Sequence, residues 1–262
     1  MKKTLLTLAL IIGGLTGAQA QAKLLTLDDS KDLTPVINAA AERGGTYNIR
    51  FGSRDVIVNN WDVLCLPFDV TPAQISNAFG YAAIARLIEN GDDGDIHFEL
   101  AVSGTIPAGT PFLMNVGDTY KTKDNFKKVV SFTGVTVNKV EASTTLTDAS
   151  GNRFISTFSP VELSGSHFWY LSEGEWHEAE EPVALKPLRC YIDVSGNTTT
   201  ETPQIIIDDP GGETAIFSVK TGSSSKKGGM TNGWFTLTGT RLTEAPAAKG
   251  IYIHQGRKVI IR

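Results

Sequence analysis

Short runs of alternating apolar and polar residues, each closed by a turn-forming residue, constrain the fold of this chain most strongly. Alternation with a period of two places successive side chains on opposite faces of a strand. Gly, Asn, Asp and Pro separate the runs, as they separate the strands of sandwiches and barrels. Strands are predicted at residues 46–51, 56–59, 63–68, 96–102, 111–116, 128–133, 136–140, 153–158, 167–171, 175–178, 188–194 and 204–208. This spacing predicts an all-β fold, an antiparallel β-sandwich.

Two short helices are expected among these strands. Thr34 can cap the first helix, Pro35 suits its first turn, and glycines at 44 and 45 end it after residue 43. A second helix is predicted at residues 73–79, resuming at residues 81–88. The predicted β-sandwich domain covers residues 21–209.

The composition changes after Asp208. Residues 210–232 are rich in Gly, Ser and Lys and predict a linker that contains one short strand near residues 215–219. Residues 233–262 follow as a compact tail. Its last two runs, 250–254 and 257–262, are separated by Gln255 and Gly256, which is a β-hairpin pattern.

Residues 1–20 have the pattern of a secretory signal peptide. They begin with Lys2 and Lys3, continue through an apolar run, and end with Ala18 and Ala20 as the small residues of a cleavage site. The apolar run is shorter than the roughly 20 residues that a membrane-spanning helix needs. Removing residues 1–20 leaves 22 basic and 28 acidic residues, a formal net charge of −6. We expect an exported protein without a transmembrane segment, and this charge does not favour nucleic-acid binding.

Cys65 and Cys190 are the two cysteines of the chain, and each lies within a run that predicts a strand. In an exported protein two such residues can persist as a disulfide that closes a long loop. The alternative is a pair of buried thiols, because free cysteine is among the most buried residue types. The sequence leaves both alternatives open.

Residues 166–182 hold the densest group of aromatic and acidic side chains in the sequence. They predict a hairpin that turns at residues 172–175. By alternation, one face of its first strand carries His167, Trp169 and Leu171, and the other carries Phe168 and Tyr170.

Trp169, Tyr170 and Trp176 of this hairpin are candidate contacts for a glycan. Exposed aromatic rings stack on the apolar faces of sugars, and the nearby carboxylates of Glu173, Glu175 and Glu178 can accept hydrogen bonds from hydroxyls. The alternative is that Phe168 and Tyr170 pack in the core, the tryptophans pair across strands, and the glutamates form a solvated face.

The sequence carries no recognisable catalytic or metal-binding motif. Its histidines, His97, His167, His177 and His254, are scattered and form neither an HExxH nor an HxH pattern. The acidic stretch at residues 90–95 departs from the spacing of a calcium-binding EF-hand loop and is interpreted as a polar turn. We therefore expect no enzymatic activity, no cofactor and no metal site.

Two parts of the chain resemble families of exported proteins. Residues 232–242 and 249–262 resemble the C-terminal sorting domains that Bacteroidota use in type IX secretion. Residues 46–50, 61–70 (WDVLCLPFDV), 106–113, 189–192 and 205–209 resemble, as an ordered series, a β-rich module of surface proteins from the same bacteria. Some of those proteins carry leucine-rich repeats, which this sequence lacks.

The resemblance implies an exported, surface-associated, non-catalytic β-domain, and it carries over no catalytic residues. If the tail is a sorting signal, the protein is expected at the cell surface or outside the cell. If the tail is only a folded end-piece, the periplasm is the expected location.

Three functions from different classes remain open. The favoured one is an adhesin-like or structural β-domain whose partner is a glycan or a host or cell-surface protein. The second is a carbohydrate-binding protein that uses the aromatic hairpin. The third is a hydrolase that uses two hairpin glutamates, which would need carboxylates roughly 5–10 Å apart. The oligomeric state does not follow from the sequence.

Overall fold

The fold is described by a computed structural model of the chain. It describes residues 21–52, 54, 58–80, 82–117, 131–199 and 202–208. After residue 208 it gives the backbone of short strands only. The predicted signal peptide, residues 1–20, lies outside the described residues, as does most of the predicted linker at 210–232.

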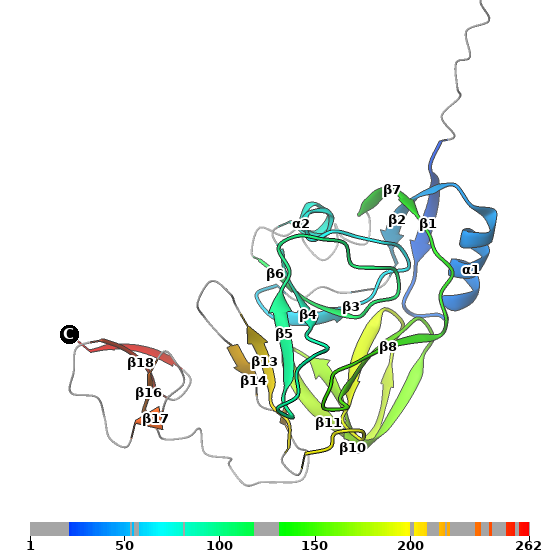
Figure 1. The fold of residues 1–262 in the computed structure, drawn as a ribbon. Coiled ribbons are helices and arrows are strands. Elements are labelled where there is room, and N and C mark those ends of the chain that lie inside the picture. Colours follow the sequence, from blue (N-terminus) through cyan, green and yellow to red (C-terminus); the bar gives the residue numbers. More distant parts are fainter. Residues whose placement is uncertain are drawn as a thin grey trace, which may run out of the picture.

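Two six-stranded sheets form most of the body (Figure 1). The first has the order β14-β13-β5-β4-β6-β3, with β3 (Trp61–Leu64), β4 (Ala82–Leu87), β5 (Ile96–Leu100), β6 (Phe112–Val116), β13 (Ile205–Asp208) and β14 (Ala215–Phe217). The second has the order β15-β11-β10-β12-β9-β8, with β8 (Ser143–Thr147), β9 (Arg153–Thr157), β10 (Val161–Ser172), β11 (Glu175–Leu185), β12 (Arg189–Asp193) and β15 (Val219–Lys220). Their inner faces share one buried core, in which Phe98 of β5 meets Phe154 of β9 edge-on, with ring centroids 5.1 Å apart.

Two smaller sheets contain the remaining strands that the structure describes. One has the order β1-β2-β7, with β1 (Lys23–Leu27), β2 (Thr46–Phe51) and β7 (Phe132–Thr136). The other has the order β17-β16-β18-β19, with β16 (Trp234–Thr236), β17 (Arg241–Leu242), β18 (Gly250–His254) and β19 (Arg257–Ile261). The all-β prediction is confirmed, and β18 and β19 pair as the antiparallel hairpin expected at the C-terminus. Most strand pairs are antiparallel, but β1–β2, β5–β13 and β11–β15 are parallel, so the sheets are mixed.

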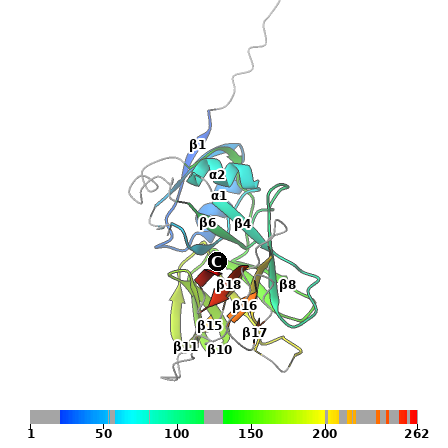
Figure 2. The same cartoon turned by 90° about the vertical axis from the view of Figure 1, so that its left-hand side faces the viewer.

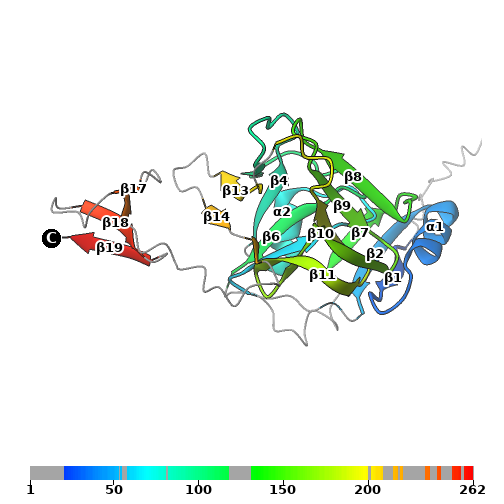
Figure 3. The ribbon, with the colours of Figure 1, turned by 90° about the horizontal axis from the view of Figure 1, so that it is seen from below.

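Two short helices lie at one end of the body. They are α1 (Thr34–Arg43) and α2 (Pro72–Phe79). Figures 1 and 2 both place them at the end where β1 and β2 lie, with β10 and β11 at the opposite end. Seen from below, α1 lies beside β1 and β2 (Figure 3). Within the described part of the chain, neither helix has the length and apolar character needed to cross a bilayer.

Local signals set the bounds of both helices. Thr34 is the first helical residue of α1 rather than its cap, and its N–H donates to Asp32 Oδ1 at 3.0 Å. The helix ends at Gly44, as predicted. α2 begins with a capping box, because Thr71 accepts from the N–H of Gln74 while the Gln74 side chain accepts from the N–H of Thr71.

One predicted element has a different structure. Residues 81–88 were expected to resume the second helix, but Ala82–Leu87 is strand β4. β4 lies between β5 and β6, and both neighbours pair with it. A short apolar run does not distinguish a buried strand from a helix by its periodicity, and here the two neighbouring strands decide the outcome.

Candidate functional site

The aromatic hairpin forms as predicted. β10 and β11 pair antiparallel, and Ser172 faces Glu175 across the turn. Glu173 and Gly174 form this turn with φ angles of 53° and 81°. Two successive positive φ angles are characteristic of a two-residue type I′ turn. Gly174 also leaves room for the side chain of Asn60, because a Cβ atom at position 174 would lie only 2.8 Å from it.

The structure corrects the prediction that both tryptophans of the hairpin contact a glycan. Trp169 is 1% exposed and Trp176 is 2% exposed, and both belong to the hydrophobic core. The indole N–H of Trp169 donates to the carbonyl of Ser166 at 3.0 Å, so its polar atom is also satisfied. An indole that is covered by protein cannot stack on a sugar. The alternative placed Phe168 and Tyr170 in the core, but the structure reverses the two faces, because it buries the tryptophans and leaves Phe168 and Tyr170 half-buried.

Tyr170 remains at the surface. It is half-buried on the face opposite Trp169, and its ring stacks on His177 with centroids 5.5 Å apart and an interplanar angle of 26°. Strand alternation predicted this separation of Tyr170 from Trp169, although not which face is covered. Of the three predicted aromatic contacts, only Tyr170 is therefore placed to meet a ligand.

A hollow of about 310 Å³ lies where β3 of one sheet meets β10, β11 and β12 of the other. We call it the Arg189 hollow. Its aromatic and polar lining consists of Trp61, Asp62, Tyr170, Ser172, Glu173 and Arg189, with aliphatic side chains from β11 beside them. The volume is at the lower end of the range for small-ligand sites. The hollow combines two half-buried aromatic side chains with charged groups, which is the composition expected of a site for a polar ligand.

Asp62 and Arg189 of this lining belong to a cluster of ion pairs that continues into the core, where the two arginines 54 and 189 share one carboxylate. Arg54 is fully buried and donates to Asp62 Oδ2 at 3.0 Å and to the carbonyl of Leu188 at 2.8 Å. Arg189 lies 3.6 Å from Asp62 Oδ2 and 3.9 Å from Asp29 Oδ2. The neighbouring Arg54 charge and burial lower the pKa of Arg189 to about 10, although the two aspartates oppose this shift.

The electrostatic balance of the hollow follows from these contacts. Two guanidinium groups, of Arg54 and Arg189, face two carboxylates, of Asp29 and Asp62. A guanidinium has five N–H donors, so the two ion pairs of Arg189 leave donors for a ligand. Arg54 and Asp29 are buried behind the lining, whose charged groups are Asp62, Glu173 and Arg189. Two carboxylates and one guanidinium, all able to form hydrogen bonds, suit a neutral ligand with many hydroxyls better than an anion.

The sequence did not single out Trp61, Asp62, Arg54 or Arg189. Trp61 and Asp62 appeared only within the WDVLCLPFDV run, and Arg189 only within a predicted strand and within the resembling stretch 189–192. Nothing local in the sequence shows that the two strands meet, because their contact is made between the two sheets. The only feature of the sequence that could have pointed to this hollow is a tryptophan followed by an acidic residue at the start of a strand.

The two cysteines lie next to each other in the core. Cys65 is 0% exposed and Cys190 is 1% exposed, and both are free thiols. Burial, together with a hydrogen bond to Cys65, raises the pKa of Cys190 well above its ordinary value. The structure therefore brings together two residues that are far apart in the sequence.

A second polar cluster lies at the ends of the strands, between the turn before β5 and the loops after β8 and β12. Asn152 and Asn197 both donate to the carbonyl of Gly94, at 3.2 and 2.9 Å. The backbone of Gly151 and Gly196 approaches so closely that a Cβ at Gly151 would lie 2.1 Å from the Gly196 carbonyl oxygen. These contacts fix the turn that carries Asp93 and Asp95, and a polar hollow of about 440 Å³ adjoins it.

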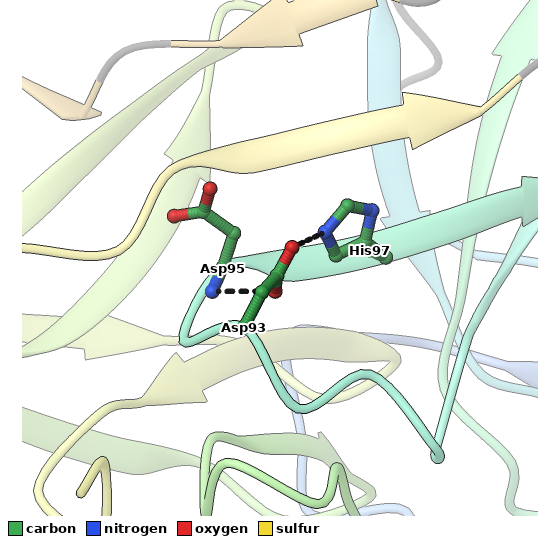
Figure 4. A group of neighbouring side chains, drawn as sticks. All are labelled: Asp93, Asp95 and His97. Carbon is green, nitrogen blue, oxygen red and sulfur yellow. Dashed lines mark hydrogen bonds and ion pairs between the residues drawn. The ribbon is translucent and has the colours of Figure 1, made fainter. Parts of the chain in front are cut away.

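His97 lies between two carboxylates in this cluster. Its Nε2 is 3.0 Å from Asp93 Oδ2, and its Nδ1 is 3.0 Å from Asp208 Oδ2. Figure 4 shows the Asp93 carboxylate with one oxygen against the imidazole and the other toward the backbone N–H of Asp95. Burial alone would lower the pKa of His97, but the hydrogen bonds to Asp208 and Asp93 outweigh it, so that the pKa is raised.

The same residues have the chemistry of a metal ligand set. One ligand atom from each of Asp93, Asp95 and His97 lies within 4.8 Å of the others. Two carboxylates and an imidazole are ligands that zinc and related divalent cations accept, with Asp208 orienting the imidazole through its second nitrogen. A cation at Nε2 would have to replace the proton that His97 shares with Asp93. From the sequence, residues 90–95 are interpreted as a polar turn and no metal site is expected.

The raised pKa of His97 predicts a pH-dependent contribution to stability. A histidine whose folded pKa is raised stabilises the fold fully below its unfolded pKa of about 6.5, and this contribution is lost as the pH rises through the folded pKa. Because Asp93 and Asp208 are partly exposed, we expect His97→Gln to cost about 0.5–1 kcal/mol at pH 6 and less at pH 9.

Urea unfolding of the natural protein and of His97→Gln at both pH values measures this difference. His167→Gln is the matched control, because His167 is a half-buried histidine that packs on Phe168. An equal cost for His97→Gln at pH 6 and pH 9 would contradict the assignment of a shared proton to this cluster.

Comparisons of the chain with protein-family models, with curated proteins and with solved structures found no match. The assignment of a function therefore depends on the chemistry of the sites described above. Of these sites, the Arg189 hollow has the lining that best fits a ligand.

Proposed function

We propose that the chain is an exported, non-catalytic, adhesin-like β-module that recognises a neutral glycan in the Arg189 hollow. The observation that carries this proposal is the juxtaposition of Trp61 and Tyr170 with Arg189 in one hollow of about 310 Å³. Aromatic side chains offer apolar area to the C–H faces of a sugar, and the charged groups offer donors and acceptors to its hydroxyls. The two carboxylates of the lining, Asp62 and Glu173, outnumber its one guanidinium, Arg189, and so favour a neutral saccharide over an acidic one.

The location proposed for this module is the cell surface or the extracellular space. The proposal rests on the signal-peptide pattern of residues 1–20 and on the likeness of residues 233–262 to sorting domains. A surface location would present the hollow to glycans of a host or of neighbouring cells.

A glycan-binding measurement on the full chain tests the proposal. The natural protein is screened against a panel of neutral and acidic oligosaccharides, and hits are titrated by calorimetry. Trp61→Ala and Tyr170→Ala are each expected to weaken binding at least about tenfold, which corresponds to about 1.4 kcal/mol. Phe168→Ala is the matched control, because Phe168 is a half-buried aromatic residue of the same hairpin that does not line the hollow.

The outcomes are distinct. Binding of a neutral glycan that is weakened in both hollow variants and retained in Phe168→Ala supports the proposal. Absence of binding across the panel, or binding that is unchanged in both hollow variants, contradicts it. Binding to a protein that persists in the variants would assign partner recognition to another surface.

A further inference from the structure

Two sulfur atoms meet in the core at the place where the two large sheets contact each other. Cys65 immediately follows β3, and Cys190 is the second residue of β12. The thiol of Cys65 lies 3.6 Å from the carbonyl oxygen of Thr157 and 3.8 Å from that of Arg189. Thr157 and Arg189 are partners in the β9–β12 ladder, and the next pair along that ladder is Ser156 with Cys190. The thiol of Cys65 therefore lies against the residue pair that is next to Cys190 in this ladder.

Burial and the neighbouring Cys65 thiol both raise the pKa of Cys190, in agreement with this placement of the two side chains beside each other. A disulfide requires two Cβ atoms that face one another at close range. Closing the bond would bring the two neighbouring sulfur atoms to about 2.05 Å from each other. Neither thiol is reachable by solvent in the folded chain.

We propose that Cys65 and Cys190 form an intrachain disulfide when the chain folds in an oxidising compartment. This inference does not depend on glycan binding by the Arg189 hollow. It selects one of the two alternatives that the sequence left open. The bond would link the residue that directly follows β3 of the first sheet to β12 of the second.

The reaction needs an external oxidant, which we take to be the disulfide of a thiol–disulfide oxidoreductase or of oxidised glutathione. One cysteine thiolate attacks the oxidant's disulfide, forms a mixed disulfide and releases one thiol. The second cysteine then attacks the mixed disulfide, which forms the Cys65–Cys190 bond and releases the second thiol. Both cysteines give up their protons, two electrons pass to the oxidant, and the oxidant leaves as two thiols.

The order of folding and oxidation follows from burial. In the unfolded chain both thiols have ordinary reactivity and are accessible. In the folded chain they are covered, and burial together with the neighbouring thiol raises the pKa of Cys190, so the reactive thiolate is scarce. The bond is therefore expected to close before the two sheets pack fully.

The link would also support the Arg189 hollow. Trp61 and Asp62 lie on β3, a few residues before Cys65, and Arg189 directly precedes Cys190. A covalent bond between these two segments would tie the strand that carries Trp61 and Asp62 to the strand that carries Arg189. The disulfide would thus restrict movement of β3 away from β12.

Refolding in a redox buffer tests the proposal. The full chain is unfolded in guanidinium chloride with reductant, and then refolded in a mixture of reduced and oxidised glutathione. Samples are quenched with acid, denatured, treated with N-ethylmaleimide and weighed as intact chains. We expect no maleimide adduct, a mass 2 Da below that of the reduced chain (two hydrogens lost), and a proteolytic peptide pair that joins Cys65 to Cys190 and separates on reduction.

A parallel sample tests the order of events. Folded, reduced chain placed in the same redox buffer is expected to gain the disulfide at least about a hundredfold more slowly, because the thiols react only after local opening. Equal rates in the two samples would overturn the proposed order.

Controls keep the test decisive. Cys65→Ser and Cys190→Ser each leave one thiol and are expected to take up one maleimide or one glutathione. Where these variants fail to fold, the mass of the natural chain still decides the question. Two maleimide adducts on the refolded natural chain, glutathione on both cysteines, or disulfide-linked dimers would overturn the proposal.

Discussion

Replacing Trp169 with alanine is expected to lower the free energy of unfolding by about 3–5 kcal/mol. The indole is 1% exposed, lies in the core between the sheets, and faces Ile192 of β12 across the β10–β12 pair. Alanine removes most of the buried apolar area of the side chain and leaves a cavity that the surrounding strands cannot fill completely. The hydrogen bond from the indole N–H to Ser166 is lost as well.

Urea unfolding followed by far-ultraviolet circular dichroism measures this loss. Trp61→Ala is the matched control, because Trp61 is half-buried at the rim of the Arg189 hollow. We expect it to cost less than half as much as Trp169→Ala. Equal costs for the two variants would contradict the division of the tryptophans into a core residue and a surface residue.

This division is also what makes the glycan experiment interpretable. A loss of binding in Trp169→Ala could come from a destabilised hairpin, since the residue supports β10 from the inside. A loss of binding in Trp61→Ala, in a protein that remains folded, reports on the hollow itself. The two tryptophans thus provide a pair of variants that separate folding from recognition.

Local patterns predicted the elements whose structure is decided locally. The alternation at residues 46–51 predicted the bounds of β2, and Pro35 with Gly44 predicted those of α1 to within one residue at its start. In each case the signal lies within the element or next to it. The aromatic hairpin was predicted for the same reason, because its turn requires the positive φ angles that Gly174 adopts readily.

Tertiary contacts decided the elements that the sequence missed. β8 has the sequence STTLT, with no strong apolar alternation, and forms at the edge of its sheet by pairing with β9. β1 pairs in parallel with β2, which lies beyond α1 in the sequence. β4 resembles a helix in composition, but the adjacent strands determine its structure.

The candidate site was only partly predictable, and for a physical reason. Alternation shows that Trp169 and Tyr170 point to opposite faces of β10, but it does not show which face the second sheet covers. The partners of Tyr170 in the hollow come from β3 and β12, far away in the sequence. No local sequence pattern predicts that these distant strands lie side by side, so Trp61 and Arg189 could be identified as lining residues only from the folded structure.

Replacing Asp62 with alanine is expected to lower the free energy of unfolding by about 3–5 kcal/mol. Asp62 Oδ2 lies 3.0 Å from the fully buried guanidinium of Arg54 and 3.6 Å from that of Arg189. Alanine removes the carboxylate that the two cations share and leaves them facing each other. The charge of Arg54 is already the largest influence that lowers the pKa of Arg189, so their mutual repulsion would no longer be offset by Asp62.

Arg54→Met is the complementary variant, because methionine retains much of the length of the side chain without its charge. Asp62 would keep Arg189 as a partner and would still accept the N–H of Val63 at 2.8 Å. We therefore expect Arg54→Met to cost less than Asp62→Ala. Arg54 also donates to the backbone carbonyls of Val63 and Leu188, which lie on opposite sides of the contact between the sheets, so its loss is not expected to be neutral.

A double-mutant cycle separates the charge pair from these other contacts. Once Arg54 is replaced with methionine, Asp62→Ala leaves only one guanidinium, Arg189, which is partly exposed to water. The double variant is therefore expected to lose less stability than the sum of the two single losses, because removing both charges avoids an unpaired buried one. The same cycle on the exposed pair Arg86 and Glu99, at 3.5 Å, is expected to give a coupling of at most about 1 kcal/mol that falls with added salt. Strict additivity at Arg54 and Asp62 would show that this ion pair does not hold Asp62 in its place in the lining of the Arg189 hollow. A large coupling would mean that this ion pair fixes the position of Arg189 before any ligand arrives.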